Sequence, residues 1–131
     1  MISRICILLL SALLSSACAS NDKSQDIGKD LSQWQNVYSY GNAEIVGDEI
    51  HLTSTGNWFF LTKKRYSDFI FEAEVKMPDV KEYSNSGIIF RAQIKKTKKS
   101  SSAIGYQAEI DPSARKWSGG LFHQGERQWL H

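Results

Sequence analysis

The sequence has little of what stabilises or identifies many small proteins. It contains 2 cysteines and 2 prolines among 131 residues. Cys6 and Cys18 both lie near the start of the chain, which excludes a disulfide within the later part. A domain without disulfides must rely on its hydrophobic core. No segment after residue 17 has the period of an amphipathic helix, so a helical bundle is excluded as well.

Neither sign of charge dominates. The chain carries 16 basic and 14 acidic residues, a net charge of +2, and losing residues 1–17 with their single Arg4 lowers it to +1. A balance so near neutrality gives no electrostatic case for nucleic acid as a partner. The basic, serine-rich run 95–102 contains no aromatic residue, which favours a solvated hairpin loop over a site for an anionic ligand.

The first eighteen residues have the pattern of an export signal. A short positive region with Arg4 precedes an apolar run over residues 5–14, which is too short to span a bilayer as a stable helix. The small residues before Cys18 indicate a bacterial lipoprotein signal, in which Cys18 is acylated and becomes the mature N-terminus. Ala17-Cys18-Ala19 also matches the ordinary cleavage pattern.

These patterns predict a lipoprotein-type signal peptide over 1–17, a flexible tether over 18–30 and one domain over 31–131. The tether is polar, with little apolar content. We therefore expect a protein of the periplasm or outer membrane of a Gram-negative bacterium, held to the membrane by its N-terminal lipid.

The domain has the pattern of antiparallel strands joined by tight turns. Residues 43–46 and 49–53 flank Gly47-Asp48 and predict a hairpin, and residues 58–62 predict a third strand. Residues 119–123 predict a short late strand. Turn residues recur at the spacing of a sandwich, which predicts an all-β fold.

Three further segments, 69–77, 87–94 and 104–111, alternate apolar and polar residues. Successive side chains of a strand point to opposite faces, so each segment is expected to give an apolar face to the core and to keep a polar one. If the three strands are neighbours, one polar surface would hold Glu72, Glu74, Arg91, Gln93, Gln107, Glu109 and Asp111.

Glu109 and Asp111 are the strongest candidates for chemistry. Two positions apart on one strand, they share a face at about 6–7 Å between Cα atoms. Ionised carboxylates this close repel one another, which raises the pKa of one of them. Paired carboxylates are the usual means of cleaving glycosides. The alternative is that they are solvated or bind sugar hydroxyls without catalysis.

Two segments carry a family resemblance: Ser84-Asn-Ser-Gly-Ile-Ile-Phe-Arg91, and Gly105-Tyr-Gln-Ala-Glu-Ile-Asp111 followed by Trp117-Ser-Gly-Gly-Leu-Phe122. Residues 66–76 share the same character. With them the chain resembles the domain-of-unknown-function 1080 family, the 3-keto-disaccharide hydrolase domain. The resemblance covers about 34–131 and implies a concanavalin-like jelly-roll sandwich with a saccharide on its concave sheet. Family domains continue for several more strands, so an incomplete sandwich is expected.

The resemblance also implies exported proteins that act on glycosides oxidised at the sugar 3-position. The ketone acidifies the neighbouring C–H, so one base can remove that proton and the glycosidic bond then breaks by elimination. Glu109 or Asp111 could be this base, and Arg91 could stabilise the enolate oxygen. A structural ion pair between Arg91 and Glu109 or Glu74 is the alternative.

Several other residues are candidates for substrate contacts. Trp117 could stack against a sugar ring, or could serve packing alone, and His123 could act as acid or base, or be structural. The full set of expected substrate contacts is Glu74, Gln93, Gln107, Trp117 and His123.

No His, Cys and Asp cluster has metal-ligand spacing and no glycine-rich phosphate loop is present, so no metal or cofactor is expected. The sequence leaves three functions open: an enzyme that cleaves 3-keto-glycosides by hydrolysis or elimination, a non-catalytic saccharide-binding module, and an inactive fragment of the enzyme. The same sandwich fold serves both lectins and enzymes.

Overall fold

The computed structural model describes residues 24–79 and 85–130. The predicted signal peptide over 1–17 and the acylation site Cys18 lie outside the described residues. The elements, in chain order, are a 3₁₀ helix η1 (Leu31–Gln33) and the strands β1 (Trp34–Asn36), β2 (Asn42–Val46), β3 (Glu49–Thr53), β4 (Phe60–Thr62), β5 (Ser86–Lys96), β6 (Ser101–Ile110), β7 (Leu121–Gln124) and β8 (Gln128–Trp129).

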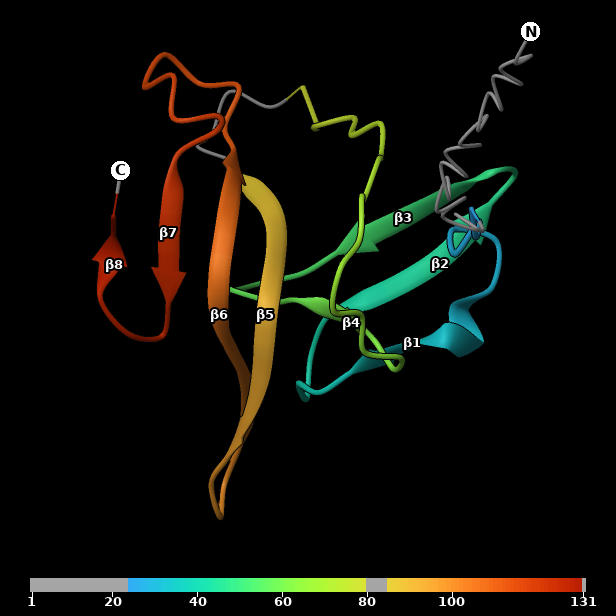
Figure 1. Ribbon diagram of the computed structural model, residues 1–131. Coiled ribbons are helices and arrows are strands. Elements are labelled where there is room, and N and C mark those ends of the chain that lie inside the picture. The colour runs from blue at the N-terminus through green and yellow to red at the C-terminus, as the bar shows by residue number, and fades with distance from the viewer. Residues whose placement is uncertain (1–23, 80–84, 131) are drawn as a thin grey trace, which may run out of the picture.

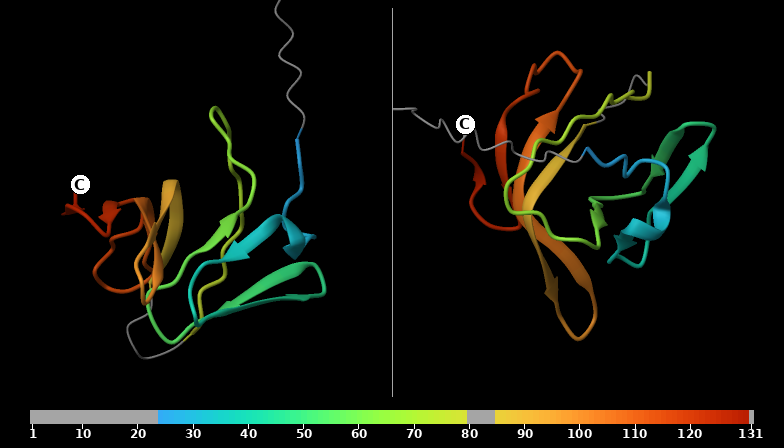
Figure 2. Two further views of the ribbon diagram at one scale, coloured as in Figure 1. Left: turned by 90° about the horizontal axis from the view of Figure 1, so that it is seen from below. Right: turned by 45° about the vertical axis from the view of Figure 1, so that its right-hand side comes forward.

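The strands form three antiparallel sheets (Figure 1). Strand β1 pairs with β4, β2 pairs with β3, and the largest sheet has the order β5-β6-β7-β8. Figure 2 shows the strands β1 to β4 to one side of this four-stranded sheet. The structure is nearly all-β, as predicted, and its antiparallel sheets are consistent with a concanavalin-like jelly-roll sandwich. In the described part of the chain, no helix is long and apolar enough to cross a bilayer.

The predicted hairpin around Gly47-Asp48 is confirmed. Val46 pairs with Glu49, which leaves a two-residue turn between β2 and β3. Gly47 has φ +65° and no atom within 4 Å of the position a Cβ would take. Glycine adopts this left-handed conformation without the steric cost that other residues incur, so the sequence favours the turn at this point.

Strands β5 and β6 form the longest pairing among the described strands, and β5 contains a bulge. Phe90 pairs with Tyr106 and Gln93 pairs with Ile104, so two residues of β5 lie opposite Gly105. Arg91 has φ +52° at this point, which is uncommon for a residue with a side chain. A bulge of this kind shifts the alternation of side chains in the strand that contains it.

The bulge corrects one sequence-based expectation. We expected Ile88, Phe90, Ala92 and Ile94 to share one face. Because the register changes after Phe90, Ile94 pairs with Ala103 and joins the face of Glu109, whereas Gln93 joins the opposite face through Ile104. Periodicity in the sequence cannot reveal the inserted residue.

A second expectation, a strand over 69–77, is wrong. In the structure this segment belongs to no sheet, and its side chains are exposed apart from the half-buried Met77. Phe69 and Val75 are 54% and 46% exposed. An alternating pattern suits a sheet, but a strand also needs a partner for its backbone hydrogen bonds. Within the described residues, 69–77 has none.

The burial of β6 is the reverse of what its apolar and polar faces suggest. The row Ala103, Gly105, Gln107 and Glu109 is buried, whereas the row Ile104, Tyr106, Ala108 and Ile110 is only half-buried. Leu61 and Ala103 are the only buried apolar residues among those described. The polar face, which we expected to lie opposite the core, is therefore the enclosed one, and the candidate carboxylates lie on it.

Candidate functional site

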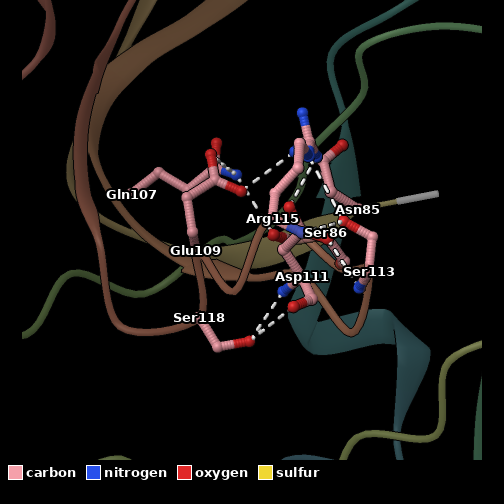
Figure 3. A network of polar contacts seen from close by, with 8 residues as sticks. All are labelled: Asn85, Ser86, Gln107, Glu109, Asp111, Ser113, Arg115 and Ser118. Atoms are coloured by element: carbon pink, nitrogen blue, oxygen red, sulfur yellow. Dashed lines mark hydrogen bonds and ion pairs between the residues drawn. The ribbon is translucent and has the colours of Figure 1, made fainter. Parts of the chain in front are cut away.

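Three polar side chains form a buried cluster at the end of β6. Gln107, Glu109 and Asp111 are 6%, 5% and 2% exposed. Gln107 and Glu109 are two positions apart on β6, and Asp111 follows at the same spacing just after the strand, so all three lie on one face. Buried polar groups are costly unless they are hydrogen-bonded, so the partners of this cluster define what it can do (Figure 3).

Glu109 is held by two amides. Asn85 Nδ2 donates to its Oε2 atom over 2.9 Å, and Gln107 Nε2 donates to its Oε1 atom over 3.0 Å. Gln107 Nε2 also donates to the carbonyl of Ser86 over 3.3 Å, so this amide ties the carboxylate to the start of β5.

Burial is the largest cause that raises the pKa of the Glu109 carboxyl above its ordinary value. The charge of Asp111 raises this pKa further, whereas hydrogen bonds from Asn85 and Gln107 and the charge of Arg115 lower it. The net shift is upward. Glu109 is therefore a carboxyl that can exchange a proton closer to neutral pH than an exposed glutamate does.

Asp111 has the opposite character. Its carboxylate accepts a hydrogen bond from Ser113 N over 2.9 Å and forms an ion pair with Arg115 over 2.5 Å. Hydrogen bonding by Ser113 is the leading cause that lowers the pKa of Asp111, and Arg115 adds to it. Asp111 stays ionised over a wider pH range than usual, so the two carboxyls are driven apart in their proton affinity.

The residues from 112 to 120 fold back onto the end of β6. Ser118 accepts from the N–H of Asp111 and donates to its carbonyl, over 2.9 Å and 3.0 Å. Glu109 N donates to Gly120 O, and Gly119 N donates to Glu109 O, both over 2.9 Å. The Arg115 guanidinium carbon lies 3.9 Å from the ring centroid of Trp117. One loop thus contacts the backbone of Glu109 and the carboxylate of Asp111, and it carries the tryptophan.

Other predicted site residues lie apart from this cluster. Arg91 is exposed at the bulge, Gln93 is exposed on the far face, and Glu74 is exposed in the unpaired segment 63–79. His123 pairs with Tyr106 on the far face of the sheet, with ring centroids 4.5 Å apart. Arg127 Nε donates to His123 Nδ1 over 3.3 Å.

Sequence reasoning missed four residues of the cluster, namely Asn85, Ser113, Arg115 and Ser118. Part of this was visible in the sequence. Asp111-Pro112-Ser113 is a typical start of a turn in which an aspartate caps its own backbone, and Arg115 follows at a distance that such a turn can close. The contact between Asn85 and Glu109 depends on the register of β5 against β6, and no local sequence pattern predicts it.

The described ranges 24–79 and 85–130 hold no group of three or more His, Cys, Asp or Glu side chains that could bind a metal ion. A cavity of about 540 Å³ opens beside the loop and is lined by Lys116, Trp117, Ser118, Gly120, Trp129 and Leu130. The arrangement therefore combines a protonatable carboxyl, a neighbouring fixed anion and an adjacent aromatic cavity.

Comparison with known proteins gives one result. The family model described as a 3-keto-alpha-glucoside-1,2-lyase-like domain matches residues 22–130. No curated protein and no solved structure gives a significant match. The match covers the whole described part of the chain, including the cluster around Glu109.

Proposed function

Since the chain belongs to the family of 3-keto-alpha-glucoside-1,2-lyase-like domains, we propose that it cleaves 3-keto-glycosides with Glu109 as the proton-transferring group. The observation that supports this most is the pair of unlike carboxyls at the end of β6. Glu109 has a raised pKa, and Asp111, two residues along, has a lowered one. Such divergence is what acid–base catalysis by carboxyls requires.

The ketone at C3 makes elimination the simplest reaction. A base removes the proton on C2, its electron pair forms the C1–C2 double bond, and the bond from C1 to the glycosidic oxygen breaks. The departing oxygen takes up a proton. The products are an unsaturated 3-keto sugar and a free alcohol, with no water consumed. Addition of water to the double bond would turn the same enzyme into a hydrolase.

Glu109 is suited to both proton transfers. A carboxylate with a raised pKa is a stronger base toward the C2 proton than an ordinary glutamate, and the protonated group can then deliver the proton to the leaving oxygen. Its Oε2 atom faces Asn85, an exposed residue just before β5. We propose that the sugar approaches from this side.

Asp111 would then act as a fixed charge and not as an acid. Its ion pair with Arg115 anchors the loop, and its negative charge raises the pKa of Glu109. Arg115 is the cation that contacts the carboxylate of Asp111. The assignment of Arg91 to the enolate oxygen stays a prediction.

The predicted substrate contacts divide into two groups. Gln107 and Trp117 belong to the cluster or its loop, and in this proposal Gln107 orients Glu109 while Trp117 contacts the sugar. Substrate contacts by Glu74, Gln93 and His123 stay predictions, and they would require a substrate that covers a wider surface. Export, acylation of Cys18 and attachment to the membrane through this lipid are also part of the proposal, based on the sequence of residues 1–18.

A non-catalytic saccharide-binding module is the second candidate. Trp117 and Trp129 beside the open cavity favour it, because exposed aromatic rings bind sugars whether or not catalysis follows. This candidate requires that Glu109 only accept hydrogen bonds from sugar hydroxyls.

Incubation of the purified chain with a 3-keto disaccharide separates the two. The enzyme hypothesis predicts release of a free sugar, seen by proton nuclear magnetic resonance together with the vinyl proton of the unsaturated product. Loss of release in Glu109→Gln, with saccharide binding retained, would support it. Binding without cleavage by the unmodified chain would favour the binding module.

A further inference from the structure

Trp117 and Trp129 line one side of the cavity beside the loop. The two indole rings meet edge to face, with centroids 4.8 Å apart and planes at 68°, and so form two walls of a corner. The tryptophans are 39% and 40% exposed, although large aromatic residues gain most from burial. Lys116 adds a hydrogen-bond donor to the lining.

This corner lies on the same face of the sheet as Glu109. Gln107 pairs with Phe122, and Phe122 pairs with Trp129, so the three side chains form one row across β6, β7 and β8. Glu109 lies on the same face, in the next row along β6, and Gly120 of the cavity lining accepts the hydrogen bond from Glu109 N. The carboxylate and the cavity therefore lie on one face of the sheet, with Gly120 between them.

The strand spacing gives the separation. Neighbouring strands lie about 4.8 Å apart, so β8 is roughly 10 Å from β6 across the sheet. An extended disaccharide is long enough to cross this width, with one ring beside Glu109 and the next in the corner.

We propose that the Trp117–Trp129 corner binds the second sugar ring of a disaccharide, the ring that leaves when the glycosidic bond breaks, and that Arg115 is its positioning residue. This inference rests on the proposed function for the identity of the leaving ring. Arg115 pairs with Asp111 on one side and stacks on Trp117 on the other. It thereby fixes the tryptophan relative to the carboxylates.

Calorimetric titration with sugars that have not been oxidised tests the subsite apart from the reaction. We expect an α-linked glucose disaccharide to bind about tenfold more tightly than methyl α-glucoside, since a stacking contact of the second ring accounts for a difference of this size. Trp117→Ala should abolish the preference, and Trp117→Phe, which keeps a ring, should retain most of it. Equal affinities, undetectable binding of both sugars, or a preference that survives in Trp117→Ala would overturn the proposal.

Arg115→Lys tests the positioning role. Lysine keeps the positive charge near Asp111 but loses the planar stacking on Trp117. We expect the preference for the disaccharide to fall about threefold or more, with the affinity for methyl α-glucoside unchanged. Arg127→Lys is the matched control, because Arg127 contacts His123 on the far face. Equal loss for both sugars would reveal a purely structural role and contradict the positioning role.

These tests also distinguish failure of the subsite from failure of the proposed reaction. If no 3-keto disaccharide is cleaved but the preference is present and disappears in Trp117→Ala, the subsite stands and the enzyme hypothesis fails. If cleavage occurs and KM does not differ between 3-keto disaccharides and methyl 3-ketoglucoside, the reaction stands and the subsite fails.

Discussion

Replacing Gly87 by alanine should destabilise the fold and displace Gln107, a neighbour of Glu109 in the candidate site. Gly87 pairs with Glu109 across the β5–β6 ladder. A Cβ at this position would lie 2.5 Å from the carbonyl oxygen of Ala108 and 2.7 Å from both Cγ and Nε2 of Gln107. The first contact is about 0.9 Å shorter than ordinary van der Waals contact and involves backbone, so side-chain rotation cannot relieve it.

Overpacking of this kind usually costs about 1–3 kcal/mol in the free energy of unfolding. For a domain of this size each kcal/mol lowers the melting temperature by about 4–8 °C. The added methyl group should also move the Gln107 amide away from Glu109. Because that amide is one of the donors that lower the pKa of Glu109, the pKa of Glu109 should rise further in Gly87→Ala.

Thermal unfolding and a carbon-13 titration of the glutamate carboxyls measure the two effects. Gly56→Ala is the matched control, since its new Cβ would come no closer than 3.7 Å to the Tyr40 ring, and its stability should stay within about 0.5 kcal/mol of the parent. A melting temperature of Gly87→Ala equal to that of Gly56→Ala would refute the packing described around Glu109.

Three further predictions concern the same network and its surroundings. The fold favours the protonated Glu109 carboxyl, so the parent loses stability as the pH rises from the ordinary glutamate range through the raised pKa, whereas Glu109→Gln does not. The free energy of unfolding of Glu109→Gln should therefore increase relative to that of the parent over this range. Urea melts at several pH values should show this trend, and a constant difference would contradict it. Asp111→Asn should destabilise the fold at neutral pH through loss of the Arg115 ion pair. The difference in free energy of unfolding from the parent should disappear in acid, below the lowered pKa of Asp111. A difference that persists in acid would show that the charge is not the cause. Tyr38→Phe removes the acceptor for the N–H of Ala103, a 2%-exposed residue, and should cost about 1–3 kcal/mol in denaturant unfolding; an unchanged midpoint would mean that the bond contributes nothing.

The parts of the fold that could be predicted from the sequence are those with local causes. The β2–β3 hairpin depends on Gly47 and the two-residue turn, both of which are visible in the sequence. The predicted strands 87–94 and 104–111 correspond to β5 and β6. Both extend further than expected into the basic run, so that only residues 97–100 are left as the turn between them. Residues 95–100 are exposed, in agreement with a solvated loop.

Features that depend on tertiary partners could not be predicted. The alternation of apolar and polar residues over 69–77 predicts which side chains would share a face. It does not predict whether another strand is available to pair with this segment. The bulge at Arg91 moves Gln93 to the face opposite Glu109. No residue in the sequence indicates that a bulge occurs there.

The candidate site divides in the same way. The shared face of Gln107, Glu109 and Asp111 follows from their spacing of two residues. Their burial, and the contacts of Asn85 and Arg115 that separate the two pKa values, depend on how β5 and the loop after β6 fold over them.

In the proposed reaction Glu109 moves the proton during cleavage of a 3-keto-glycoside. The most direct measurement follows a 3-keto α-linked glucose disaccharide by nuclear magnetic resonance in the presence of the parent chain and of Glu109→Gln. We predict an unsaturated 3-keto sugar and free glucose with the parent, and a rate at least about 10²-fold lower with Glu109→Gln. Cleavage by Glu109→Gln at a rate within tenfold of the parent would contradict the claim.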